Sequence, residues 1–311
     1  MIPENVAGTV AELKIIKYIY SSNVTRTTVI TSIKNENLTA NISHLGAELI
    51  SLQSNLKREY IWEGNPAFWG KHSPILFPIV GTLKNNIFHH KGINYNLSRH
   101  GFAREMEFAL LKSTKNSATF MIQSNRETLL LYPFEFELYL IYTLEGNKLI
   151  LEYHVINTGK YEMPFSIGAH PAFALPNNFE NYAIAFDKEE SFEYSLLEND
   201  LVSNNTKKLE VENNKFQLSY DLFENDALIF KTIQSKTITL LENDQPFLKV
   251  CFEGFPSLGL WTKSNAPFIC IEPWYGYSDL SESSSTLIEK EGIQIIAQQA
   301  TFKSEFSIEI L

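Results

Sequence analysis

The sequence of 311 residues is 44% hydrophobic and 20% charged, which is typical of a soluble globular protein, and its formal net charge is −10. The acidic balance argues against nucleic acid or an anionic membrane surface as the main partner, because both are negatively charged. Two cysteines, Cys251 and Cys270, give neither a disulfide framework nor a Cys-x-x-Cys zinc motif, and no run of eighteen apolar residues predicts a membrane span. We therefore expect a cytoplasmic protein with reduced, incidental thiols and with no nucleic-acid or membrane partner.

Residues 1–28 differ in pattern from the rest of the chain. Apolar side chains from Val6 to Tyr20 recur at roughly helical spacing, which permits a short amphipathic helix. Lys14 and Lys17 interrupt the only apolar stretch, so a secretory signal is not expected. The segment is interpreted as a leader of open role: a native extension, an interaction helix or an added sequence.

From Val29 onward the pattern predicts β-strands. Apolar and polar residues alternate over 134–143 and again over 149–155, and the turn sequence at 145–147 lies between them, which predicts a long antiparallel hairpin. Similar patterns predict further strands within 41–49, 236–241, 247–252 and 302–311. Regular short strands without long helices predict an all-β fold, a large antiparallel β-sandwich. No linker divides the chain, so 29–311 is expected to form a single domain.

Three short segments each place one proton-transfer residue among glycine, proline and aromatic residues: Arg99–Arg104, Gly168–Phe173 and Ile271–Gly276. The proton-transfer residues are His100, His170 and Glu272. Imidazole and carboxylate groups can run acid/base chemistry without metal or cofactor. Taken singly, a histidine in a β protein is usually a surface or structural residue and a glutamate is usually solvated, so the prediction depends on the three segments together.

In this order, the three segments resemble the aldose 1-epimerase (galactose mutarotase) superfamily, and most of all the branch described as LacX-type or hexose-6-phosphate 1-epimerase-like. The resemblance covers roughly residues 29–311 and implies a single galactose mutarotase-like β-sandwich, or supersandwich. It implies an isomerase that interconverts the α and β anomers of a hexose or hexose 6-phosphate. It also implies a sugar or sugar phosphate as the partner, no cofactor, no metal, and a monomer or homodimer.

The resemblance also implies the roles of the three residues. Glu272 corresponds to the base that removes the proton of the anomeric hydroxyl, and His170 to the acid that protonates the ring oxygen. His100 corresponds to the residue that binds and polarises the sugar oxygens. Ring opening requires the pair to begin as carboxylate and imidazolium. Burial in its apolar stretch should raise the pKa of Glu272, and the following Pro273 predicts the end of a strand.

Two further residues are candidates for substrate binding. The resemblance assigns Asp226 to the sugar hydroxyls, although Asp221 and Asp244 lie nearby in the sequence. Trp274 follows Glu272 by two residues, so both side chains should lie on the same face of a strand, where the indole can stack on a sugar ring. Other aromatic residues near the motifs could line the same wall or simply fill the core: Trp62, Phe68, Trp69, Phe102 and Tyr275.

Arginines decide whether a phosphate could bind. Arg99 and Arg104 flank His100, and guanidinium groups hold phosphate oxygens in a forked geometry. Arg104 could equally pair with a carboxylate such as Glu105. Lys71 and Lys84 lie near residues 74–81, a segment that also resembles part of the lining of the family's site. The sequence therefore allows both a free aldose and a sugar phosphate.

His72, His89 and His90 invite a metal interpretation. Adjacent residues on a strand point to opposite faces, so His89 and His90 are poorly placed to share an ion. We expect all three to be surface residues.

Two other functions remain open. A non-catalytic sugar-binding or sugar-sensing protein could share the fold, because a fold does not fix a function. A glycoside hydrolase or lyase could also share it, but hydrolysis needs two carboxylates flanking the scissile bond, whereas here one carboxylate accompanies imidazoles.

Overall fold

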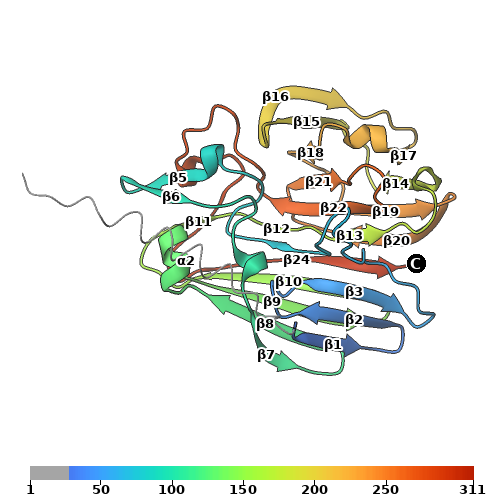
Figure 1. Cartoon of the computed structure of the whole chain (residues 1–311), viewed down its shortest axis with the longest axis horizontal. Coiled ribbons are helices and arrows are strands. Elements are labelled where there is room, and N and C mark those ends of the chain that lie inside the picture. Colours follow the sequence, from blue (N-terminus) through green and yellow to red (C-terminus); the bar gives the residue numbers. More distant parts are fainter. Residues whose placement is uncertain (1–27) are drawn as a thin grey trace, which may run out of the picture.

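The computed structural model describes residues 28–311, and the leader helix considered above lies outside the described residues. The expected all-β architecture is confirmed: two large antiparallel sheets dominate (Figure 1). The α-helix α2 (Arg126–Leu131) has six residues and is capped at its N-terminus by Asn125, whose side chain accepts two backbone N–H groups. Within the described part of the chain, no helix is long and apolar enough to cross a membrane.

The larger sheet has nine strands in the order β17-β14-β19-β20-β24-β10-β9-β8-β7. The C-terminal strand therefore lies inside this sheet, between β20 and β10 (Figure 1). The strands are β7 (Ala109–Ser113), β8 (Ser117–Gln123), β9 (Phe136–Glu145), β10 (Lys148–Asn157), β14 (Tyr182–Phe186), β17 (Lys215–Gln217), β19 (Thr237–Glu242), β20 (Gln245–Cys251) and β24 (Thr301–Ile310).

The second large sheet has eight strands in the order β16-β15-β18-β21-β22-β12-β4, with β13 paired to β22 beside β12. Most of its strands are short, and β22 is central. They are β4 (Ile75–Leu76), β12 (Ile167–Ala169), β13 (Ala172–Ala174), β15 (Glu193–Glu198), β16 (Leu201–Lys208), β18 (Leu228–Phe230), β21 (Ser257–Trp261) and β22 (Phe268–Tyr275).

Three small sheets complete the strand structure of residues 28–311. One contains β1 (Ile30–Lys34), β2 (Leu38–Ser43) and β3 (Leu49–Ser54), another pairs β5 (Ile87–His90) with β6 (Ile93–Asn96), and the third pairs β11 (Met163–Phe165) with β23 (Gln294–Ile296). Single-turn 3-10 helices lie at Lys84–Asn86, Ala103–Glu105, Phe179–Asn181, Tyr220–Phe223 and Leu287–Glu289.

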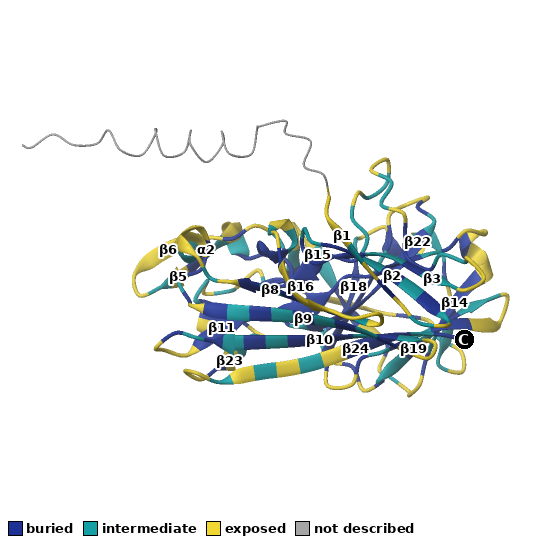
Figure 2. Cartoon of the chain, turned by 90° about the horizontal axis from the view of Figure 1, so that it is seen from below, coloured by how far each residue is buried: buried dark blue, intermediate teal, exposed yellow. Residues whose placement is uncertain are grey.

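The strands expected from alternation are confirmed. β9 pairs with β10 along its whole length, and the turn at 145–147 connects them. β19 pairs with β20, β2 with β3, and β24 runs almost to the C-terminus. Burial alternates residue by residue along β9 and β10, visible as bands in Figure 2, because one face of these strands packs on the core.

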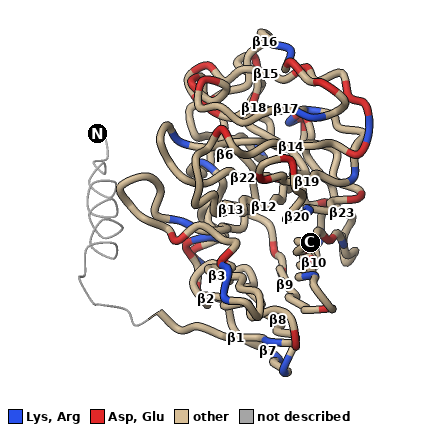
Figure 3. The backbone as a smooth tube through the Cα atoms, turned by 90° about the vertical axis from the view of Figure 1, so that its right-hand side faces the viewer, with Lys and Arg blue, Asp and Glu red and all other residues tan. Residues whose placement is uncertain are grey.

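The main apolar core lies between the two large sheets. It contains Leu138 and Leu140 of β9 together with Leu258 of β21 and Ile269 and Ile271 of β22. Charged residues are interspersed along the chain in the view of Figure 3.

The residues of β22 that alternate with Ile269 and Ile271 point away from the main apolar core. This second face of β22, which includes Glu272 and Trp274, carries the candidate site.

Candidate active site

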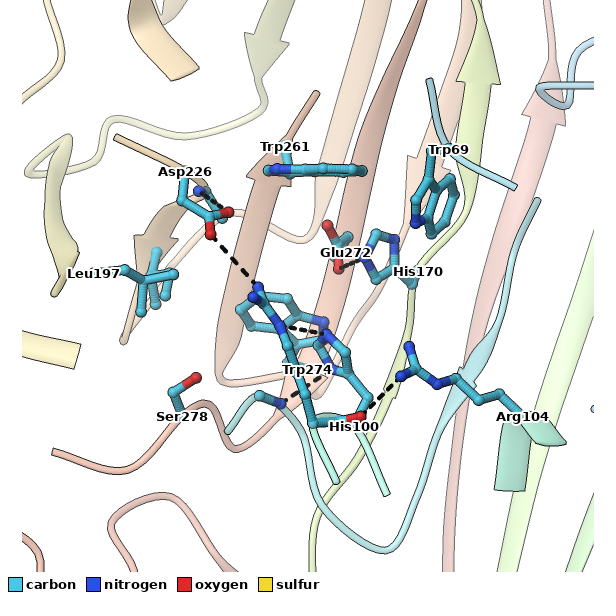
Figure 4. Close-up of a pocket in the computed structure, with 14 residues that line it drawn as sticks. Trp69, His100, Arg104, His170, Leu197, Asp226, Trp261, Glu272, Trp274 and Ser278 are labelled. Carbon is cyan, nitrogen blue, oxygen red and sulfur yellow. Dashed lines mark hydrogen bonds and ion pairs between the residues drawn. The ribbon is translucent and has the colours of Figure 1, made fainter. Parts of the chain in front are cut away.

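A cavity of about 280 Å³ opens over the second face of the eight-stranded sheet. This volume is close to the lower limit of small-molecule sites, roughly 300 Å³. All seven site residues expected from the sequence line it: Arg99, His100, Arg104, His170, Asp226, Glu272 and Trp274. All of these except Arg99 are labelled in Figure 4. They come from segments far apart in the chain that only the sheet brings together.

Strand register places His170 against Glu272. Gly168 of β12 pairs with Trp274, and Ala172 of β13 pairs with Cys270. His170, halfway between those two partners, therefore lies opposite Glu272 on β22. The two side chains approach to 3.3 Å between Nε2 and Oε2, and both are almost completely buried (Figure 4).

Pro273 does not end its strand, and that expectation was wrong: β22 continues to Tyr275. The backbone N–H of Ile271 donates to the carbonyl oxygen of Pro171, so residues 271 and 273 direct their nitrogens toward the β12–β13 side, where the pairing of β12 with β22 stops at Gly168 and Trp274. Because the strand ladder is interrupted there, the missing N–H of Pro273 breaks no ladder bond.

Burial dominates the electrostatics of the Glu272–His170 pair. It raises the pKa of Glu272 well above its usual value, and Arg99 only partly opposes this. Burial, together with the positive charge of Arg99, lowers the pKa of His170 to about 3. The free pocket thus favours the neutral pair, with the shared proton on Glu272, rather than the carboxylate and imidazolium expected from the sequence.

A tight turn aims His100 into the cavity. His100 and Gly101 have consecutive positive φ angles of 68° and 70°, and a Cβ at Gly101 would lie only 2.3 Å from the carbonyl oxygen of Phe77. Glycine is therefore required at the second position. The backbone N–H of Gly81 donates to Nδ1 of His100 at 3.1 Å, which leaves Nε2 as the protonated nitrogen of the neutral ring. Burial lowers the pKa of His100 well below its usual value and keeps the ring neutral.

Arg99 is held between two carboxylates. Its Nη1 lies 3.0 Å from Oδ1 of Asp200, and its Nη2 lies 3.7 Å from Oδ2 of Asp226. Asp200 lies in the turn between β15 and β16, so the tip of this hairpin contacts the guanidinium of a motif residue from another part of the chain. The Nε of Arg99 is 3.3 Å from Nε2 of His100.

Asp226 is the aspartate that the fold brings into the cavity. The alternatives Asp221 and Asp244 are both exposed and do not line it. Asp226 has a positive φ of 75°, and its Oδ1 accepts the backbone N–H of Ala227, which orients the carboxylate.

Arg104 lies at the opposite side of the cavity from Asp226 (Figure 4). Its Nη2 donates to the carbonyl oxygen of Arg99 at 2.9 Å, and its Nε lies 3.7 Å from Glu105. Arg104 therefore stabilises the motif turn. Lys71 pairs with Glu105 at 3.0 Å, and neither Lys71 nor Lys84 lines the cavity.

Trp274 lies flat against the sheet because the neighbouring strands provide glycines. A Cβ at Gly259 of β21 would lie 2.4 Å from the indole, and a Cβ at Gly168 of β12 would lie 2.5 Å from it. The indole Nε1 donates to the carbonyl oxygen of Ala169 at 3.2 Å. Trp274 thus forms a fixed aromatic floor beside Glu272.

Of the other aromatic candidates, only Trp69 lines the cavity. Its ring stacks on His170, with centroids 4.8 Å apart and an interplanar angle of 24°. Trp62, Phe68, Phe102 and Tyr275 pack in or against apolar clusters instead.

Among the described residues, the histidines considered for a metal do not form a ligand group. His90 is only partly exposed, because its ring packs on Phe134. His89 is exposed on β5, as expected. His72, however, is only partly exposed: its backbone N–H donates to the buried Glu48, and its Nδ1 lies 3.7 Å from the same carboxylate. His72 is therefore a structural residue rather than a surface one.

A model of the aldose 1-epimerase family matches residues 29–284. The chain belongs to the aldose 1-epimerase family. Protein LacX of Lactococcus lactis subsp. lactis is 36% identical over 294 residues, which cover 90% of this chain and 98% of the relative.

Solved structures support the same assignment. A galactose mutarotase related enzyme from Lactobacillus acidophilus has a TM-score of 0.86 at 33% identity, and the match covers 91% of this chain and 97% of that one. A galactose mutarotase-like protein from Lactobacillus casei has a TM-score of 0.86 at 28% identity, covering 91% and 100%. The aldose 1-epimerase fold is therefore shared along nearly all of the described chain.

Several lining residues of this aldose 1-epimerase family member were not found from the sequence. Trp261 lines the cavity from β21, and its ring stands edge-on to both Trp69 and His170. Its position is fixed by pairing with Cys270 on β22, two residues before Glu272. That register was not visible in the sequence, and neither was the contact of Asp200 with Arg99.

Proposed function

We propose that the protein is an aldose 1-epimerase that interconverts the α and β anomers of a hexose or hexose 6-phosphate. The observation that carries the proposal is the buried Glu272–His170 pair, 3.3 Å apart, in a cavity bordered by three tryptophans. Opening a cyclic hemiacetal needs one base and one acid, and aromatic faces suit the apolar side of a sugar ring. Residues 29–311 would act as one domain, because the lining residues extend from Trp69 to Ser278.

The pair is suited to a reaction in which the two groups exchange roles. In ring opening, the carboxylate of Glu272 removes the proton of the anomeric hydroxyl while the imidazolium of His170 protonates the ring oxygen. Because burial favours the neutral pair in the free pocket, the proton of Glu272 first passes to His170, and ring opening then returns the pair to its neutral form. After rotation about the C1–C2 bond, reclosure returns each proton and gives the other anomer.

His100 and Arg99 would hold a substrate oxygen. Because Nδ1 of His100 accepts the Gly81 N–H, its Nε2 carries a proton and faces the Nε–H of Arg99 across 3.3 Å. Two donors that face each other cannot bond together. A sugar oxygen in the cavity, beside both nitrogens rather than on the line between them, would accept from both, and this supports oxygen binding at that point.

The balance of charge around Arg99 supports a neutral aldose as the better substrate. Asp200 and Asp226 both lie beside its guanidinium, so a phosphate would have to displace or approach two carboxylates. Arg104 is directed to the backbone of Arg99 and to Glu105. A hexose 6-phosphate remains the alternative substrate, tested in parallel below.

The test is anomer exchange measured by NMR with glucose, galactose and glucose 6-phosphate. Acceleration of any of them supports the proposed reaction, and the sugar that responds identifies the substrate class. Binding without acceleration would replace the proposal with a sugar-sensing role. Activity on a glycoside with a blocked anomeric hydroxyl would instead indicate a hydrolase or lyase, because a mutarotase base finds no proton there.

A further inference from the structure

A third donor lies beside the acid/base pair. Cys270 precedes Glu272 by two residues on β22, so the thiol and the carboxylate lie on the same face of the strand. One ring nitrogen of His170, Sγ of Cys270 and one carboxylate oxygen of Glu272 all lie within 4.8 Å of one another. The thiol is completely buried behind the pair and does not line the cavity.

Two buried polar atoms in this cluster lack a well-formed hydrogen bond among the described residues: Nδ1 of His170, and Oε2 of Glu272, whose near neighbour is Nε2 of His170 at 3.3 Å. Glu272 is 1% exposed and His170 is 7% exposed. Unpartnered buried polar atoms are costly, and each one calls for an explanation such as a catalytic role or a bound ion or water. Sugar oxygens can satisfy them from the cavity side, but a sugar does not explain the thiol.

We propose that His170, Cys270 and Glu272 form a binding site for a thiophilic divalent cation such as Zn²⁺, whose occupancy blocks the acid/base pair. Nitrogen, thiolate and carboxylate oxygen are the donor types that zinc takes, at about 2.0–2.3 Å, and three protein ligands leave a fourth position open. That position faces the cavity, where water or a sugar hydroxyl can fill it. Bond lengths of this size place the ligand atoms roughly 3.3–3.8 Å from one another. Since the three donor atoms now lie within 4.8 Å of one another, the thiol of Cys270 must move toward His170 and Glu272 by about 1 Å when the ion binds.

Charge favours a divalent ion here. One thiolate and one carboxylate balance Zn²⁺, so the complex is neutral in a buried place where a net charge would be expensive. Arg99 and Arg104 also line the cavity, but carboxylates lie beside both guanidinium groups: Asp200 and Asp226 at Arg99, and Glu105 at Arg104. Binding releases the thiol proton and the proton shared by Glu272 and His170 to solvent, so it weakens as the pH falls.

The first experiment is a titration of the full chain with Co²⁺, followed by absorption. Co²⁺ replaces Zn²⁺ in such sites, and thiolate ligation gives an intense near-ultraviolet charge-transfer band. We expect this band in the wild type and in Cys251→Ala, the matched control, because Cys251 lies on β20 in the other large sheet. The band should be absent in Cys270→Ala and in Cys270→Ser, the second variant being kept in case the first does not fold.

The second experiment measures anomer exchange with added Zn²⁺, and this part rests on the proposed function. Zinc should slow exchange at least about tenfold in the wild type and in Cys251→Ala, while Cys270→Ala requires at least about tenfold more zinc for the same effect. Equal zinc sensitivity of wild type and Cys270→Ala would overturn the site, as would absence of the wild-type band or its loss in Cys251→Ala. Because the Co²⁺ titration does not depend on turnover, failure of the metal site and failure of the epimerase proposal are told apart.

Discussion

The two large sheets use the same strand pairing for different purposes. In the nine-stranded sheet, β9 and β10 are ten residues long, and every second residue is buried while those between are half-buried or, at Glu145, exposed. In the eight-stranded sheet, the first seven residues of β22 are all buried, because the main core covers one face and the cavity walls cover the other. A strand covered on both faces can bury a carboxylate beside an imidazole, whereas a strand with one wet face keeps its polar residues solvated.

The sharpest test of this difference is Glu272→Gln. We expect anomer exchange to fall by about 10²–10⁴-fold, because an amide cannot remove the anomeric proton. The measurement is NMR exchange at saturating sugar, with binding followed separately by calorimetry. Glu305→Gln, an exposed position on β24 in the other sheet, is the control and should exchange at the wild-type rate. Unchanged catalysis in Glu272→Gln would remove this residue from the mechanism.

Leu151→Ala in β10 should lower the stability of the fold and leave anomer exchange intact, the reverse of what is expected for Glu272→Gln. The Leu151 side chain is 3% exposed in the main core, so its truncation should lower the free energy of unfolding by about 2–5 kcal/mol. Exchange per folded molecule should stay within about twofold, since Leu151 does not line the cavity. Urea denaturation gives the stability, and Ile150→Ala on the half-buried face serves as the milder control. A large loss of exchange in a folded Leu151→Ala protein would mean that packing in the nine-stranded sheet also controls catalysis at the eight-stranded sheet.

The pH dependence of the unfolding free energy distinguishes the buried carboxyl of Glu272 from a solvated carboxyl. The pKa of Glu272 is raised by burial, so its contribution to stability is complete below pH 4.5 and is lost as the pH rises through its folded pKa. Over that interval the unfolding free energy of the wild type should fall relative to Glu272→Gln by at most about 1.4 kcal/mol per pH unit. Urea denaturation of both proteins between pH 4.5 and 7 measures this. A difference that does not change with pH would show that Glu272 is ionised throughout.

The smallest expected effect concerns the hairpin tip. Asp200→Asn removes one of two carboxylates from Arg99, an exposed pair of the kind that contributes up to about 1 kcal/mol. The exchange rate on glucose 6-phosphate relative to glucose should therefore rise by up to about fivefold. Glu198→Gln removes the same charge from the same hairpin without a contact to Arg99 and should leave the ratio unchanged. Equal ratios in both variants would mean that Asp200 does not select against phosphate.

The sequence by itself determined the all-β class, the long hairpins and the three motifs. Each of these is local: alternation along 134–155 reports one wet and one dry face, and glycine after His100 reports a left-handed turn. The residues His100, His170, Glu272 and Trp274 could be named because each lies within a short recognisable segment.

Only the tertiary structure decided the register, the partners and the protonation of the site. His170 faces Glu272 because strands on both sides of it pair with β22, and Pro273 continues the strand because its nitrogen faces a gap in the ladder. The neutral form of the pair, the contact of Asp200 with Arg99 and the approach of Cys270 likewise depend on residues distant in sequence. Burial and charge act through space, and the chain order does not record those distances.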